Sequence, residues 1–217
     1  MTAPRLARDG KKMTIEQTGT VIARKQVSRR KLLDAARKLF TERGYHDTRP
    51  QDIARAAGVG HGTFYLHFAD KRECFLAFVD EAADELHETV LVHTANATTI
   101  ADVVRGIIDA CQEYNLTNPG VLAAAMLDAS VIGGGSDLPA LCLVDRWAHD
   151  WTSRLQDLMD KGIIANDFDP RVIGHAIVGA CCQALNGSFR DGLRNEDVIN
   201  DIIIFISRAL GPPPGGR

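Results

Sequence analysis

Apolar side chains recur at intervals of three and four residues through most of this chain. One buried helix face is formed by the first such stripe, which comprises Leu32, Leu33, Ala36, Leu39 and Phe40. The stripe predicts a helix over residues 25–43 that ends at Gly44. No segment shows a convincing two-residue alternation of a strand, so the pattern indicates an all-α fold of about nine helices.

A long helix is predicted to begin after Asp70, which is a good N-cap residue. Glu73 stands three positions later and completes a capping-box pattern. Apolar positions continue to about Val92, and a helix of roughly 25 residues would be long enough to join two parts of the molecule, at about 1.5 Å per residue. Further helical patterns follow, bounded by glycine, proline or polar residues: 100–116, 120–132, 138–161, 170–190 and 196–210.

The last two of these segments are apolar on nearly every side. A helix of that composition buries more than one face. Residues 170–190 and 196–210 therefore either complete the core of a single chain or form a four-helix interface between two copies. The pattern favours the second interpretation, a symmetric homodimer.

A glycine turn separates two short predicted helices, residues 50–57 and 61–67. Gly58 can adopt the left-handed conformation that ends the first helix, and Val59 fills the corner. The second helix is rich in hydrogen-bonding groups and poor in charge, and its exposed face offers His61, Thr63, Tyr65 and His67. A helix-turn-helix of this kind fits the major groove of DNA, where side chains reach base edges.

Charge is distributed unevenly between the two ends of the chain. Residues 1–72 carry 16 Lys and Arg against 7 Asp and Glu, whereas residues 73–217 carry 9 against 21. The overall net charge of −3 is therefore the sum of a basic head and an acidic body. Such a head is attracted to phosphate, and the acidic body discourages nonspecific wrapping, so double-stranded DNA is the expected partner.

The chain of 217 residues divides by composition into four segments. Residues 1–24 are expected to be a flexible basic arm, 25–71 the DNA-binding domain, 72–210 a helical effector-binding and dimerisation domain, and 211–217 a disordered tail. No stretch resembles a signal peptide or a membrane span, and five cysteines without CxxC spacing suit a reducing compartment. A cytoplasmic protein without metal or cofactor is expected.

Three motifs carry a specific family resemblance. They are Arg-Arg-x-Leu-Leu-Asp-Ala-Ala-x-x-Leu-Phe at 29–40, Asp-Ile-Ala-x-x-Ala-Gly-Val at 52–59, and Gly-Thr-Phe-Tyr-x-His-Phe-x-x-Lys at 62–71. They resemble the N-terminal domain of the TetR family of transcriptional regulators. The resemblance covers about fifty residues, and it implies an all-α homodimer that binds a palindromic operator, usually as a repressor released by a small ligand.

The resemblance also implies which residues contact DNA. It places Gln51, His61, Thr63, Tyr65 and His67 toward the duplex and assigns Lys71 to phosphate. For His67 two roles stay open, a bond to phosphate or packing alone. Arg49 and Gly60 stand where the family commonly has hydroxyl caps, so Thr48 or Asp47 is a candidate cap and Arg49 a candidate charged contact. Arg29 and its basic neighbours either extend the DNA contact or add only nonspecific attraction.

The sequence identifies effector-binding residues less specifically than DNA-binding residues. Trp147 and Trp151 are four residues apart and so share a helix face, which suits either a mostly apolar pocket or ordinary core packing. An apolar or aromatic effector is expected. The candidate ligand-binding residues are Cys111, Tyr114, Met126, Trp147, Trp151, His175 and Gln183.

Enzymatic function is not expected, because the chain contains no GxSxG elbow, P-loop or HExxH motif. The glycines at 58, 60 and 62 precede a helix without a strand before them, so they do not form a dinucleotide fingerprint. A DNA-binding protein without an effector is the remaining alternative. The long helical body after the DNA head argues against a purely architectural role.

Overall fold

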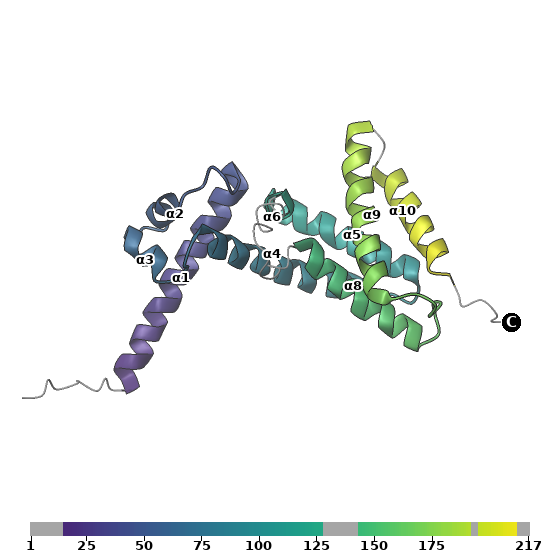
Figure 1. Ribbon diagram of the computed structural model, residues 1–217, viewed down its shortest axis with the longest axis horizontal. Helices are drawn as coiled ribbons and strands as arrows, with labels where there is room; N and C mark the ends of the chain where they lie inside the picture. Colours follow the sequence, from purple (N-terminus) through teal and green to yellow (C-terminus); the bar gives the residue numbers. More distant parts are fainter. Residues whose placement is uncertain (1–14, 128–142, 192–194, 212–217) are drawn as a thin grey trace, which may run out of the picture.

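The computed structural model describes residues 15–127, 143–191 and 195–211, and every regular element in these ranges is a helix (Figure 1). The all-α prediction is confirmed. A head is built from α1 (Ile15–Arg43), α2 (Pro50–Ala56) and α3 (His61–Tyr65). The body contains α5 (Ile100–Thr117), α6 (Val121–Leu127), α8 (Leu143–Asp160), α9 (Pro170–Asp191) and α10 (Asn195–Ala209), and α4 (Lys71–Thr94) runs from head to body.

One boundary differs from the expected one. Helix α1 begins at Ile15, so residues 15–24 are helical and the expectation of a flexible arm is wrong for them. Extending a helix that is already packed costs little, and the polar residues around Gly19 do not stop it. Residues 1–14, 128–142 and 212–217 lie outside the described ranges, so the outer arm, the tail and the glycine-rich break at 133–135 stay untested.

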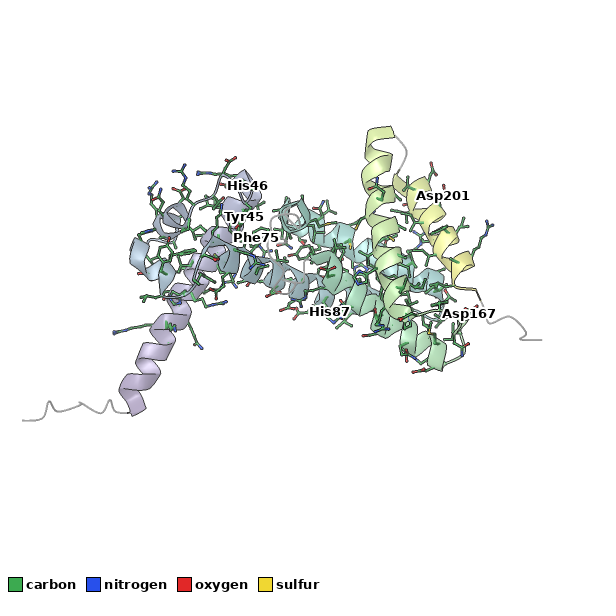
Figure 2. All side chains as sticks on the ribbon, viewed as in Figure 1. Tyr45, His46, Phe75, His87, Asp167 and Asp201 are labelled. Carbon is green, nitrogen blue, oxygen red and sulfur yellow. The ribbon has the colours of Figure 1, made fainter. Side chains whose placement is uncertain are left out.

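The head is organised around buried aromatic rings. Phe40 of α1 meets Phe75 of α4 edge to face at 5.1 Å between ring centroids, and Tyr45 meets the same Phe75 edge to face at 5.0 Å. Figure 2 shows Tyr45 and Phe75 together where α1 and α4 meet. Phe64 and Phe68 are fully buried from the opposite side. Burial of each such ring favours folding by about 1.5–3 kcal/mol, so these residues fix the short helices in place.

Thr48 shapes the loop before α2 instead of capping that helix. Its side chain is buried, and its hydroxyl donates to the carbonyl of Gly44 at 2.8 Å. The N-cap position is held by Arg49, whose side chain makes no capping hydrogen bond. Pro50 occupies the first turn of α2 and has no N–H. This position therefore has no backbone donor that a capping side chain would have to satisfy.

Helix α4 begins as its sequence predicts. The Asp70 carboxylate accepts from the Glu73 N–H at 2.8 Å, which is the expected cap. The Glu73 side chain accepts from the N–H of Ala69 at 2.5 Å. Two orphan donors at the junction of head and body are therefore satisfied, and the direction in which α4 leaves the head is fixed.

The core of the head continues into the body. Tyr114 of α5, Val121 and Ala125 of α6 and Leu143 of α8 belong to the same buried cluster as the aromatic residues of the head. A second cluster joins α5, α8, α9 and α10 at the far end of the molecule (Figure 1). In the described part of the chain, no helix is long and apolar enough to cross a membrane.

Helices α8 and α9 approach each other most closely at Gly174. A Cβ at this position would lie 2.5 Å from the carbonyl oxygen of Ala148 and 3.0 Å from the hydroxyl of Thr152. Neither the carbonyl nor the adjacent backbone can yield without moving the helix. The absence of a side chain at residue 174 therefore sets the distance between α8 and α9.

Gly174→Ala is expected to destabilise the protein by about 1–3 kcal/mol, because the added methyl group overpacks this contact. The measurement is the free energy of unfolding in urea. Gly62→Ala is the matched control: nothing lies within 4 Å of a Cβ there, so it should be neutral or stabilising by up to about 1 kcal/mol. Equal effects of the two substitutions would contradict the close approach.

Candidate nucleic-acid interface

Helices α2 and α3 present one polar surface on the outside of the head. Gln51 of α2 and His61 and Tyr65 of α3 are exposed, while Thr63 is half-buried. Tyr65 keeps 49% of its surface accessible although it is an aromatic residue. Its ring meets that of His61 edge to face at 5.2 Å between centroids, so the two side chains, four residues apart, share one face.

The chain holds this surface outward because the opposite side of each helix is buried. Ile53 of α2 and Phe64 of α3 are both 0% exposed. The Val59 N–H donates to the Ala54 carbonyl at 3.0 Å and closes the turn, while Gly58 adopts φ +67°. Because α3 has only five residues, it is held by this packing and not by its own hydrogen bonds.

The structure adds two exposed residues that the sequence analysis did not select. Arg55 lies four residues after Gln51, and 78% of its side chain is exposed apart from a 3.6 Å contact with Asp52. The four-residue spacing from Gln51 is the signal that would have identified it. Leu66, at the C-cap of α3, is 72% exposed, and no periodic pattern marks it.

Arg29 and Arg49 border this surface from either side. The Arg29 guanidinium lies 5.2 Å from the centroid of the Phe68 ring, which places a positive charge of α1 beside the end of α3. Arg49 is exposed at the start of α2. Both residues therefore leave a positive charge exposed on the head, and their contact with phosphate stays a prediction.

His67 departs from the predicted arrangement. Helix α3 ends at Tyr65, and the His67 N–H bonds to the Phe64 carbonyl at 3.0 Å, which tightens the turn. Its ring is half-buried against α1, with Nε2 2.7 Å from the Ser28 hydroxyl. The expectation that His67 lies on the exposed face of α3 is therefore wrong, because the buried Phe64 and Phe68 pull the chain inward here.

The protonation state of His67 follows from its surroundings. The Ser28 hydroxyl lies 2.7 Å from His67 Nε2 and 3.1 and 3.0 Å from the backbone carbonyls of Arg24 and Lys25. Among the described residues, the buried Nδ1 has no hydrogen-bond partner. Desolvation first, and then the charges of Lys25 and Arg29, lower the pKa of His67 below its ordinary value of 6.5.

Lys71 also has a role other than the expected one. Its ammonium group donates to the carbonyls of Tyr45 and His46 at 2.7 and 3.4 Å and lies 4.1 Å from the centroid of the Tyr45 ring. These contacts tie the first turn of α4 to the loop before α2. Lys71 thus helps to hold the head together, and its predicted contact with phosphate stays a prediction.

The predicted effector residues are not brought together into one site. Cys111 and Met126 are partly buried against the first core cluster, Trp151 is buried in the second, and Trp147 packs against both. Tyr114 is buried and bonded to charged residues, and His175 and Gln183 are exposed on α9. Helical periodicity groups residues on one helix, but it does not say which faces of different helices meet.

The described cysteines of the body, Cys111, Cys181 and Cys182, are partly buried. Desolvation raises the pKa of the Cys111 thiol to about 12 and that of the Cys181 thiol to about 11. Cys182 is shifted in the same direction for the same reason. Protonated thiols are poor nucleophiles, which agrees with a packing role.

Part of the chain, mostly in the head, is similar to known proteins. Residues 32–78 match the model described as bacterial regulatory proteins, tetR family. The chain is 32% identical over 88 residues to the transcriptional repressor AcnR of Corynebacterium efficiens, covering 41% of this chain and 44% of AcnR. It is 34% identical over 86 residues to the transcriptional activator FasR of Mycolicibacterium smegmatis, covering 40% and 39%. The chain therefore matches less than half the length of these relatives.

Most of the chain is also similar in fold to solved structures. The fatty acid degradation regulator FadR of Bacillus halodurans superposes with a TM-score of 0.65, covering 87% of this chain and 96% of that one. Sequence identity over that superposition is 19%, so the likeness concerns the fold alone. These relatives are transcriptional regulators and not enzymes.

The surroundings of His67 generate a pH prediction. Because its folded-state pKa is lowered, the unfolded chain binds the proton more readily. The contribution of neutral His67 to the free energy of unfolding is present in full above about pH 6.5. It is lost as the pH falls through the folded-state pKa of His67. The melting temperature should therefore decline between pH 7.5 and 5.5, and less so in His67→Gln, which keeps a donor for Ser28.

Thermal unfolding of both proteins at several pH values is the measurement. Other titrating groups are the same in both chains, so the difference between the two curves isolates His67. A difference that stayed constant across this pH range would show that protonation of His67 is not coupled to folding.

Proposed function

The DNA-binding domain of this chain is that of the TetR family of bacterial transcriptional regulators, and from this premise we propose a ligand-released repressor that binds a palindromic operator as a homodimer. The observation that carries the proposal is the exposed polar surface of α2 and α3 above a fully buried aromatic base. We also propose that the protein is soluble and cytoplasmic, because its DNA target lies in the cytoplasm.

Recognition of the operator is assigned to five side chains. Gln51 and His61 can exchange hydrogen bonds with base edges, and the hydroxyls of Thr63 and Tyr65 can donate to phosphate or bases. Arg55, exposed beside Gln51, adds a charged contact. Since few of these groups are charged, most of the salt dependence would come from Arg29, Arg49 and the basic helix α1.

Dimerisation is proposed through the outer faces of α9 and α10. Large apolar side chains are left in water there: Val172 is 64% exposed, Ile204 46% and Phe205 62%. A Cβ at Gly179, in the middle of α9, would meet nothing within 4 Å. An exposed mid-helix glycine costs about 1 kcal/mol relative to alanine, and close approach of a second helix would account for it.

A second copy on this surface would leave both heads, one on each protomer, away from the interface. Figure 1 shows α9 and α10 at the end of the body remote from α1, α2 and α3. A symmetric dimer presents the same surface twice, so its target would be an inverted repeat. The two α3 helices would then enter major grooves one helical turn apart, about 34–36 Å, or a multiple of it.

The effector is proposed to bind among α5, α6 and α8. Cys111, Met126 and Trp147 come from these three helices and are partly buried next to the core of the head. Their chemistry suits an apolar or aromatic molecule. An effector that bound better to a body with splayed heads would lower operator affinity by the difference between its two affinities.

Tyr65→Ala is expected to abolish specific operator binding while the protein stays folded and dimeric. Tyr65→Phe should weaken binding about three- to tenfold, the cost of one hydrogen bond. The operator would come from selection out of a random DNA library, and affinity would be measured by fluorescence anisotropy. Leu116→Ala, on an exposed residue of α5, is the control and should bind normally. Normal binding by Tyr65→Ala would exclude this residue from the interface.

Phe205→Arg is expected to convert the dimer into a monomer, because two added charges would face each other across an apolar contact. Sedimentation velocity reports the mass directly. Leu116→Arg serves as the control, since Leu116 is 81% exposed and lies outside the proposed interface. A Phe205→Arg protein that remained dimeric would move the interface away from α10.

A further inference from the structure

One guanidinium joins the head to the body. Arg37 of α1 donates two parallel hydrogen bonds to the Glu85 carboxylate of α4, at 2.7 and 2.8 Å. The same group donates to the Asn118 side chain, just after α5, at 2.7 Å, and the Tyr114 hydroxyl donates to Glu85 at 2.6 Å. We call Arg37, Glu85, Tyr114 and Asn118 the junction network.

The junction network is shielded from water more than an ordinary surface ion pair. Only 18% of the Arg37 side chain is exposed, and its fork engages the carboxylate with both arms. The hydrogen bonds from Arg37 hold the pKa of Glu85 below its usual value, and the bond to Glu85 raises the pKa of Arg37. Bidentate, partly desolvated pairs of this kind have a defined geometry, and loss of one partner leaves a charge without compensation.

Close packing beside the junction network leaves the α5–α6 turn little freedom relative to α1. Gly120 adopts φ +78°, and a Cβ there would lie 2.9 Å from the Thr41 side chain of α1. Val121 and Ala125 of α6 follow directly and are buried in the core of the head. A displacement of this turn would therefore be passed to α1.

Other ion pairs of the described residues connect fewer elements. Arg146 of α8 binds Asp80 and Asp84 of α4 at 2.9 and 2.5 Å and does not involve α1. Arg30 joins α1 to Glu81 of α4, but half of its side chain is exposed. Arg37 combines α1, α4 and the end of α5 in one cluster, which distinguishes it from both.

We propose that the junction network fixes the angle of the head on the body and thereby sets the operator half-site spacing that the protein accepts. This inference rests on the proposed dimeric DNA binding. If α9 and α10 hold two bodies together, the distance between the two α3 helices depends on how each head is oriented. Arg37 is thus a positioning residue: it does not contact DNA, and it acts through the placement of α3.

The test compares DNA duplexes in which two selected half-sites are separated by spacers that differ by one base pair. Wild type should prefer one spacing. Arg37→Met removes the fork but keeps much of the side-chain volume, and it should lower affinity for that spacing about tenfold, within the usual range of coupling between sites. Neighbouring spacings should lose less, and a single half-site should bind within about twofold of wild type.

Arg146→Met is the matched control, since it also removes an arginine that bridges two helices, and its spacing profile should equal that of wild type. Tyr114→Phe, which deletes one hydroxyl, should broaden the profile more weakly and serves if Arg37→Met fails to fold. An unchanged profile in a folded Arg37 or Tyr114 variant would overturn the inference, as would an equal loss on single half-sites. If wild type bound no half-site at all, the proposed function itself would fall and this inference with it.

Discussion

Burial of aromatic side chains beneath α3 is the constraint on which the DNA-binding surface depends. A five-residue helix is too short to persist in water, and Phe64 and Phe68 hold it against α1 and α4. Once those rings are inside, His61 and Tyr65 must point outward. The same packing turns His67 inward, so one physical cause produces both the exposed surface and the departure from the expected contacts.

The same core extends beyond the head, and this continuity gives the molecule a way to relate its two ends. Tyr114 contributes its ring to the shared buried cluster and its hydroxyl to the Glu85 carboxylate. Apolar packing of this kind resists separation but tolerates sliding, whereas a forked ion pair has a defined direction. The combination explains how a body built around apolar side chains can hold a charged head at one angle.

Much of the fold was predictable from local pattern. The stripe at Leu32 to Phe40, the cap at Asp70 and the turn at Gly58 each depend on neighbours within four residues, and each was found where expected. The length of α1 was not, because a helix end lacking a strong stop signal is decided by small propagation energies. The exposure of Arg55 could have been predicted, because Arg55 lies four residues after Gln51 on the same helix. No pattern in the sequence indicated the exposure of Leu66.

The sequence by itself determined the helical class, the helix-turn-helix and the separation of basic from acidic halves, since these follow from local spacing and composition. Only the tertiary structure decided that Lys71 secures a loop, that His175 and Gln183 face outward and that Arg37 reaches Glu85 and Asn118. Those partners are separated from one another by tens of residues or lie on different helices. Their meeting depends on how helices pack across the whole core, and periodicity along one helix carries no information about that.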